Sequence, residues 1–311
     1  MSNINIFYYR LRKEKNFGDE LGPFIVEKLS KKKTNRIFIH GNKYNLIKGF
    51  LVLIYGILKK YHNIGDLLGY IRGKIQKQYI LSAGSIIHFD YKENTKIWGS
   101  GIIKKDDTIN PGVFCAVRGY KTIKRMDELK LIPPSVVGDP ALILPLVYQT
   151  SKKKKYRIGI IPHIIHFDKF KNMENCDNIR IINLNSDSIE NTIQEICACE
   201  YILSSSLHGL IVPHAYGIPS LYIKLEGKLN GDNIKFSDYF SSLNMVDYMP
   251  IEVPNNNWED ENKMIALIQK NMNFALPDTR TLNTIQANLL AVAPFEVDEK
   301  YLNMVNEQVF I

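Results

Sequence analysis

The stretch EYILSSSLHGLIVPHAYGIPSLYIK at residues 200–224 combines two apolar strands with a polar turn and a short helix. Residues 201–203 are an apolar strand, which the three serines that follow bring to an end. Residues 210–216 favour a helix that ends at Gly217, and residues 219–223 favour a second strand. Two strands joined by a helix in this way pair in parallel, so the stretch predicts an α/β fold.

The polar turn of this stretch is expected to form a binding site. In an open parallel sheet, ligands lie beyond the carboxyl ends of the strands, and the free N–H groups of a following helix attract anions. Pro213 cannot lie deep inside a helix, so we expect the helix to begin near Gly209 or Leu210. The residues placed at this anion-suited end are Ser204, Ser205, Ser206 and His208.

Strands in the first half of the chain also end in small or charged residues. A strand at residues 4–9 precedes a glycine-containing loop at residues 16–22, after which we expect a helix to start at Pro23. Four later strands follow the same rule. Their end residues are Gly84, Ser85, Gly101, Arg118 and Asp139. A doubly wound sheet whose strand ends line one crevice produces this pattern.

The second half of the chain repeats the alternation of strands and helices. The polar segment SKKKK at residues 151–155 is a break at which we place a domain boundary. After it, one strand ends at His163, and a turn-like polar segment at residues 231–240 carries Lys235. A helix near residues 282–292 is expected to pack back on the first half.

Length and composition agree with two globular domains. The chain has 311 residues, which fits two domains of about 150 residues each. We therefore predict two Rossmann-like, doubly wound parallel-sheet domains, residues 1–150 and residues 151–311, facing a central cleft. The first residues are strand-like rather than a secretory leader, so a cytoplasmic location is expected. The four cysteines lack paired spacing, which favours reduced thiols and no metal site.

Positive charge is concentrated in the first quarter of the chain. The net charge is +8, and residues 10–77 contain 16 Lys/Arg against 5 Asp/Glu. Within them, the apolar segment at residues 49–58 is too short to span a bilayer and has lysines on both sides. Such a segment suits an anionic membrane surface, here the inner face of the cytoplasmic membrane, and the alternative is a buried helix with solvated lysines at its ends. No nucleic-acid-binding module accompanies the charge, so no nucleic-acid partner is expected.

Eight short motifs occur in a fixed order over residues 4–240. They are NFGD at 16–19, GS at 84–85, WGSG at 98–101, VRG at 117–119, GDPAL at 138–142, GIIPH at 159–163, SSSLHG at 204–209 and KFSDY at 235–239. Each motif is weak evidence alone, but all eight stand in the order in which one protein family carries them, and this is a strong signal. With them, the chain resembles the polysaccharide pyruvyltransferase family.

The resemblance implies both a fold and a reaction. Members resemble two-domain glycosyltransferases of the B type and act in bacterial exopolysaccharide and capsule synthesis. They transfer the enolpyruvyl unit of phosphoenolpyruvate to a sugar as a cyclic ketal. The implied acceptor is an oligosaccharide on a polyprenyl diphosphate, and no cofactor is implied because phosphoenolpyruvate is a substrate. Many members carry Arg where Ser206 stands, so a guanidinium contact to the donor is absent at that position.

The charge of phosphoenolpyruvate suggests roles for the basic residues. The donor needs cationic groups and N–H donors, and ketal formation needs an acid and a base. His208 and His163 are the acid/base candidates, the alternative for His208 being to fix the turn. Arg118 is the first choice for a carboxylate or phosphate clamp, the alternative being a solvated arginine at a helix start. The residues assigned to donor binding are Arg118, Ser204, Ser205, Ser206, Gly209 and Lys235.

Acidic residues fit the acceptor side, because a carboxylate would repel the donor. Asp19 is therefore a candidate base or hydrogen-bond acceptor for a sugar hydroxyl, the alternative being a cap for a helix at residues 21–30. Asp139, before Pro140, is equally suited to a turn. The residues assigned to the acceptor side or to structure are Asn16, Gly18, Gly84, Ser85, Gly101 and Asp139.

Two other functions remain open from the sequence. The same architecture serves nucleotide-sugar glycosyltransferases, and fold alone does not determine function. A catalytically silent sugar-binding subunit would bind oligosaccharide without releasing phosphate from phosphoenolpyruvate.

Overall fold

The computed structural model describes residues 3–8, 16–37, 46–59, 64–75, 78–151, 153–173, 178–186, 188–225, 231–253, 258 and 260–309. Parts of two sequence predictions lie outside these residues. They are the end of the first predicted strand, at residue 9, and the lysines at 43 and 60 that flank the apolar segment.

The first sheet contains five described strands in the order β2-β1-β3-β4-β5, and all neighbouring strands pair in parallel. The strands are β1 (Ile4–Phe7), β2 (Thr34–Ile37), β3 (Ile80–Leu81), β4 (Lys96–Ser100) and β5 (Val113–Val117). The helices of this half are α1 (Phe17–Ser30), α2 (Leu46–Leu58), α3 (Ile64–Ile75) and α4 (Tyr120–Glu128). The short helices η1 (Pro140–Ile143) and α5 (Leu144–Val147) lead to the second sheet.

The second sheet also contains five described strands, ordered β10-β9-β8-β6-β7 and paired in parallel throughout. The strands are β6 (Tyr156–Ile161), β7 (Ile179–Ile181), β8 (Cys199–Ser204), β9 (Ser220–Lys224) and β10 (Ile251–Glu252). The helices up to β10 are η2 (Ile164–Met173), α6 (Ile189–Cys197), α7 (His208–Ala215) and α8 (Ile234–Ser242). The chain ends with α9 (Glu261–Lys270), α10 (Met272–Ala275), α11 (Thr279–Ala291) and α12 (Glu299–Val309).

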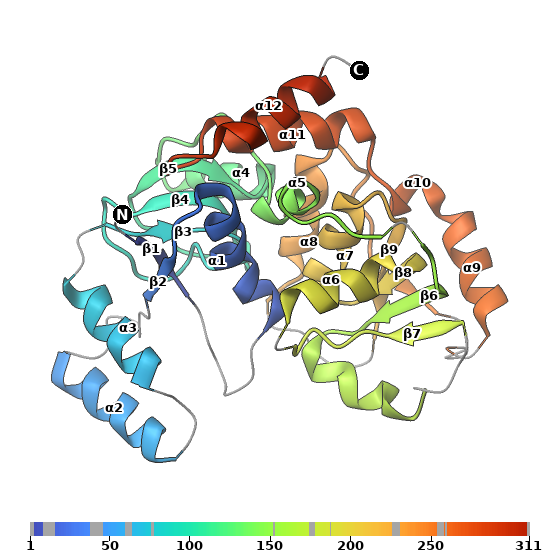
Figure 1. Ribbon diagram of the computed structural model, residues 1–311, viewed down its shortest axis with the longest axis horizontal. Coiled ribbons are helices and arrows are strands. Elements are labelled where there is room, and N and C mark those ends of the chain that lie inside the picture. Colours follow the sequence, from blue (N-terminus) through green and yellow to red (C-terminus); the bar gives the residue numbers. More distant parts are fainter. Residues whose placement is uncertain are drawn as a thin grey trace.

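The two sheets lie side by side with helices around them (Figure 1). Two parallel sheets interleaved with helices confirm the predicted α/β class with two Rossmann-like units. Both sheets have the same strand order, because the second sheet, read from its β7 edge as β7-β6-β8-β9-β10, matches β2-β1-β3-β4-β5 position by position. The order reverses between β1 and β3 in one sheet and between β6 and β8 in the other. Ligands of open α/β sheets bind beyond the strand ends at such reversals.

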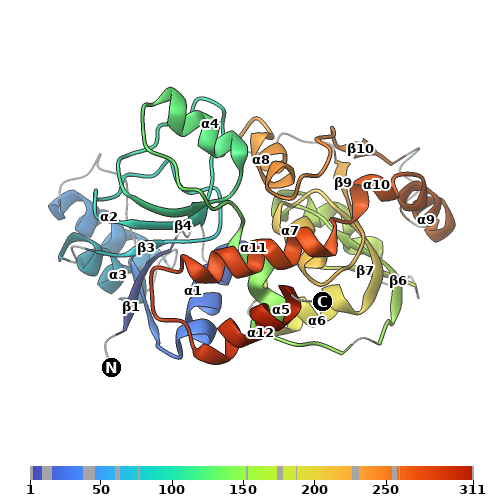
Figure 2. The same cartoon turned by 90° about the horizontal axis from the view of Figure 1, so that it is seen from above.

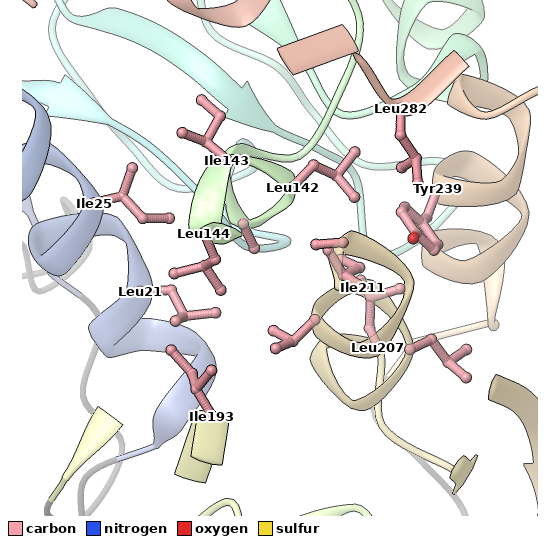
Figure 3. Close-up of a cluster of buried hydrophobic side chains, with 14 of the residues drawn as sticks. Leu21, Ile25, Leu142, Ile143, Leu144, Ile193, Leu207, Ile211, Tyr239 and Leu282 are labelled. Carbon is pink, nitrogen blue, oxygen red and sulfur yellow. The ribbon is translucent and has the colours of Figure 1, made fainter. Parts of the chain in front are cut away.

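One hydrophobic core joins the two halves of the chain. Buried side chains from α1, η1, α6, α7 and α11 belong to a single cluster (Figure 3). Leu21 of α1, Leu142 of η1 and Ile211 of α7 all belong to it, and Leu282 of α11 lies beside Tyr239. The connection between the sheets is therefore packed as core rather than extended as a linker.

The C-terminal helices return to the first half of the chain. Figure 2 shows α11 crossing from the second sheet towards the first, and α12 running back from near α1. The Trp98 indole of β4 donates a hydrogen bond to the Leu289 carbonyl at 3.0 Å and meets the Phe295 ring edge-on. The Asp298 N–H donates to the Leu29 carbonyl at the end of α1. The chain thus joins the halves twice, through η1–α5 and through α11–α12.

Two element predictions were wrong. Helix α1 begins at Phe17 rather than Pro23, because the Asn16 side chain accepts a hydrogen bond from the Gly18 N–H and caps the helix. The buried Phe17 and Leu21 then hold the first turns in the core. The segment at residues 231–240 is not a simple turn, since α8 begins at Ile234 within it.

Candidate functional site

The serine turn between β8 and α7 is held by its own hydrogen bonds. The Ser204 hydroxyl donates to the Ile161 carbonyl at 2.9 Å and accepts from the Ser206 N–H at 3.0 Å. Ser205 Oγ accepts from the His163 N–H at 2.9 Å. A Cβ at Gly209 would lie 2.2 Å from Ser204 Oγ, so the turn needs glycine there. These contacts tie the end of β8 to the end of β6, at the reversal of the second sheet.

His208 is the first residue of α7, so the helix begins one residue before Gly209, the earlier of the two expected starts, and Pro213 lies inside the helix rather than at its start. Its ring lies against the backbone of α1, since a Cβ at Gly18 would be 2.2 Å from His208 Nδ1. Its Nε2 is buried and has no hydrogen-bond partner within the described residues. Burial, with the positive charges of Arg118 and Lys235, lowers the His208 pKa to about 3. The imidazole is therefore neutral at pH 7 and offers an unpaired polar atom.

His163 lies at the matching position after β6. Its Nδ1 accepts a hydrogen bond from the Ile165 N–H at 3.4 Å, which leaves Nε2 to carry the proton of the neutral ring. Burial and the positive charge of Lys235, followed by His166, lower the His163 pKa to about 4. Both histidines at this reversal are thus uncharged donors or acceptors in the free protein.

Arg118, directly after β5, is fully buried and engages groups from several segments. Its Nε donates to Asp238 Oδ2 at 3.0 Å, and its Nη2 lies 2.9 Å from the same oxygen. Nη1 donates to Ser85 Oγ at 2.5 Å, and Nη2 donates to the Ile102 carbonyl at 2.6 Å. The carboxylate of Asp238 also accepts from the N–H and the hydroxyl of Thr122. All three guanidinium nitrogens contact protein groups, so Arg118 is a fixed positive charge.

Lys235 is the second cation near the histidines. It lies in the first turn of α8, is buried, and has its Nζ 5.3 Å from the centre of the Phe236 ring. Burial and the nearby Arg118 charge lower its pKa to about 8. The positive charge of Lys235, added to that of Arg118 in its pair with Asp238, favours the binding of an anion near the histidines.

Asp19 follows Gly18 in the first turn of α1, next to the backbone on which His208 packs. Burial raises the Asp19 pKa to about 7, against the lowering effect of a hydrogen bond from Asn16. A carboxyl group that titrates near neutral pH suits proton transfer. The alternative in which Asp19 caps the helix is wrong, because Asn16 fills that position.

Asp139 and the glycine-serine motif lie beside Arg118. Asp139 caps η1 by accepting from the Ala141 N–H at 2.9 Å, while its other carboxylate oxygen is buried without a hydrogen-bond partner in the described part of the chain. Burial raises the Asp139 pKa to about 6. The Gly101 N–H donates to the Gly84 carbonyl, and a Cβ at Gly101 would lie 2.6 Å from Arg118 Cζ. Gly84 and Gly101 therefore shape the Arg118 environment.

The structure brings together residues predicted separately from both halves. His163, the serine turn and His208 meet at one reversal, and the charges of Arg118 and Lys235 act on His208. Two buried residues were missed as partners of the site. Asp238 stands inside the KFSDY motif, which could have indicated it, whereas Thr122 gave no signal. His214 is structural, because it bonds Tyr239 and the carbonyls of Ser220 and Ala275.

Comparison with known proteins identifies the family. The uncharacterized protein L143 of Acanthamoeba polyphaga mimivirus is 29% identical over 237 residues, which cover 73% of this chain and 78% of that protein. The family model described as polysaccharide pyruvyl transferase matches residues 3–226. This match spans both sheet reversals and the serine turn at residues 204–209, and it confirms the resemblance found in the sequence motifs. The protein belongs to the polysaccharide pyruvyl transferase family.

Proposed function

We propose that this protein transfers pyruvate from phosphoenolpyruvate to two hydroxyls of a sugar in a surface-polysaccharide precursor, forming a ketal and releasing phosphate. The observation that carries the proposal is the buried Nε2 of His208, which has no hydrogen-bond partner among the described residues and lies near the positive charges of Lys235 and of the Arg118–Asp238 pair. A compact anion carrying a carboxylate and a phosphate complements this arrangement, because the cations offset its charge and Nε2 reaches its oxygen or methylene group. Family membership supports the same reaction.

The atoms of this reaction balance without a cofactor. One sugar hydroxyl proton ends on the methylene carbon, which becomes the ketal methyl group, and the second leaves with phosphate. Two C–O bonds form to the central carbon as its C–O bond to phosphate breaks. Once the bound donor anion raises its pKa and it takes up a proton, His208 or His163 would deliver that proton to carbon, and Asp19 would take one from the sugar. The Asp19 pKa of about 7 supports its role, because both protonation states are populated at neutral pH.

We further propose that the donor binds to the domain at residues 151–311 and the acceptor to that at residues 1–150. His163, His208 and Lys235 belong to the later segment, and Asp19 to the earlier. Ser204 to Ser206 and Gly209 shape the donor side, with Arg118 adding charge from across the sheets. Asn16, Gly18, Gly84, Ser85, Gly101 and Asp139 would shape the acceptor side. A ligand-bound structure with the donor held only by residues 16–19 would contradict this division.

The acceptor of the proposed reaction is an oligosaccharide carried on a polyprenyl diphosphate. Such a lipid stays in the bilayer, so transfer would take place at the inner face of the cytoplasmic membrane. Residues 10–77 contain 16 Lys/Arg and only 5 Asp/Glu, and this supports the placement, because anionic headgroups attract clustered cations.

Phosphate release tests the proposed function directly. Purified protein is mixed with phosphoenolpyruvate and candidate lipid-linked sugars, and phosphate and a pyruvylated product should appear in equal amounts. A thermal-shift experiment adds a comparison of ligands, since a ligand that binds the folded state raises Tm. Stabilisation by phosphoenolpyruvate supports the proposal. Stabilisation by uridine or guanosine diphosphate alone would favour a nucleotide-sugar glycosyltransferase, and oligosaccharide binding without phosphate release would favour a silent subunit.

A further inference from the structure

Helix α2 buries one face and exposes apolar side chains on the opposite one. Leu53 is fully buried in a cluster with Tyr8 and Tyr70. Leu51, Tyr55 and Leu58 are 57%, 61% and 76% exposed. At 3.6 residues per turn these three lie about 140–160° around the helix from Leu53. The exposed residues therefore form one stripe, which we call the α2 outer stripe, on the side away from the protein.

Helix α3 supports α2 and repeats its pattern. It contacts both β2 and α2, so it lies between the first sheet and α2. Tyr70 is buried, whereas Ile64, Leu68 and Ile75 are exposed and lie about 120–160° around the helix from it. Figures 1 and 2 both place the pair at the end of the molecule farthest from the second sheet. The pair thus carries apolar surface at an extremity, where a large flat partner can reach it.

The charge of the surrounding chain identifies the kind of partner. Residues 28–89 contain 12 Lys/Arg and 1 Asp/Glu, and that acid, Asp66, is buried. Lys28, Lys31 and Lys32 pair with acids of α6 and of the segment before α12, so they belong to the folded body. Lys59 instead lies exposed at the end of α2, with its Nζ 5.8 Å from the centre of the Tyr55 ring in the outer stripe. An apolar stripe with the Lys59 ammonium at its end, in a stretch of chain rich in Lys and Arg, is complementary to a layer of anionic headgroups over hydrocarbon.

The length of α2 defines how it would meet a bilayer. Its 13 residues extend about 20 Å, less than the hydrocarbon thickness of about 30 Å. Within the described residues, no helix is both long and apolar enough to cross a membrane. We infer that α2 lies in the plane of an anionic membrane surface, with its outer stripe inserted among the lipids and Lys59 at the headgroups. The inference deepens the proposed function by naming the surface that would bring the protein to a lipid-linked acceptor.

Vesicle binding tests the apolar part of the inference. Wild-type protein should co-sediment at low salt with phosphatidylcholine vesicles that contain phosphatidylglycerol, and less with phosphatidylcholine alone. Replacing Leu51, Tyr55 and Leu58 by Ser should weaken binding more than tenfold, because each exposed side chain loses its burial in lipid. The matched control replaces Ile132, Val246 and Met249 by Ser. These are also exposed, and their loss should change binding by less than about twofold.

Charge variants test the electrostatic part. Lys59→Gln with Lys60→Gln should weaken binding by about fivefold per charge, and added salt should reduce the difference. The control pair is Lys153→Gln with Lys155→Gln, two exposed lysines far along the chain from α2, which should have little effect. Absence of wild-type binding to anionic vesicles, or unchanged binding of the Leu51/Tyr55/Leu58 variant, would overturn the inference.

The alternative occupant of the outer stripe is a second copy of the chain. Light scattering after gel filtration distinguishes the two occupants. If the wild-type protein is a dimer, the Leu51/Tyr55/Leu58 variant is a monomer and vesicle binding is unchanged, the outer stripe is a dimer interface and not a membrane-binding surface. Circular dichroism of each variant confirms that the fold persists. The vesicle experiments contain neither donor nor acceptor, so their failure would leave the proposed reaction standing, and failure of phosphate release would leave vesicle binding standing.

Discussion

The His208 side chain combines an unpaired buried nitrogen with a positively charged environment, and its substitution separates binding from proton transfer. His208→Ala should leave the fold intact and lower turnover by about 10²-fold or more, the usual scale for a positioned acid or base. His208→Gln should recover donor affinity better than rate, because Gln donates a hydrogen bond but transfers no proton at neutral pH. Steady-state kinetics and donor titrations on both variants give the comparison.

Two results would revise this role. A loss of donor affinity with normal turnover in both variants would make His208 a binding residue and leave His163 as the acid. Full activity in both would reduce the serine turn to a structural element.

Ligand binding should change the protonation of His208. In the free protein its pKa is lowered to about 3, so the folded state binds fewer protons than the unfolded state between about pH 3 and 6.5. This residue therefore costs stability as pH falls through that range. A bound trianion would offset the Arg118 and Lys235 charges, so the pKa should rise when phosphoenolpyruvate is added. NMR titration of the ring, with His208→Gln for assignment, measures it, and an unchanged pKa would argue against the donor lying beside His208.

Residue types at strand ends could be read from the sequence, but their partners could not. Arg118 and His163 were selected because each follows an apolar strand, and that reasoning needs only local pattern. The Arg118–Asp238 pair joins residues 120 positions apart, so it depends on how the two sheets are placed. The lowered pKa of Lys235 likewise comes from burial and a neighbour in the other half of the chain.

At the level of elements, the contact between α1 and α7 depends on the absence of a side chain at Gly18. A Cβ there would lie 2.2 Å from His208 Nδ1, so Gly18→Ala should displace the ring and reduce turnover about as much as His208→Ala. The double variant should be more stable than the sum of the single changes predicts, because removing the ring relieves the clash. Unfolding in denaturant measures this coupling, and additive effects would show that the helices adjust without moving His208.

Local composition misled the prediction of two helices. The glycines in the segment FGDELGP after Asn16 favoured a loop, but capping by Asn16 and burial of Phe17 outweigh their low helix propensity. Helix α8 is short and begins after Asn233, which has a left-handed backbone (φ 68°) and forms no side-chain cap bond, so its start departs from the usual N-cap geometry. For α2 the sequence predicts either a membrane-surface segment or a buried helix, and for α3 it predicts no element, because the contacts of α3 with β2 and α2 lie outside its own residues.

For the whole molecule, the ion pair between Arg118 and Asp238 links the two halves. Asp238→Ala would leave the guanidinium buried without its carboxylate and should reduce the free energy of unfolding by about 3–5 kcal/mol. Asp247→Ala is the control, because its pair with Lys121 is exposed and 4.0 Å long, and it should cost less than about 1 kcal/mol. Chemical denaturation compares them. Equal losses in the two variants would mean that solvent reaches the Arg118 pair.

The double connection between the halves also sets an order for folding during synthesis. Trp98 is covered by Leu289 and Phe295, and the end of α1 is bonded to Asp298, so the first sheet lacks part of its cover until almost 200 further residues have been translated. A nascent chain that stops before α11 presents this tryptophan and its apolar neighbours to solvent. Such surfaces are what chaperones bind, so incomplete chains would be retained near the ribosome or degraded, and only the finished polypeptide closes its own core.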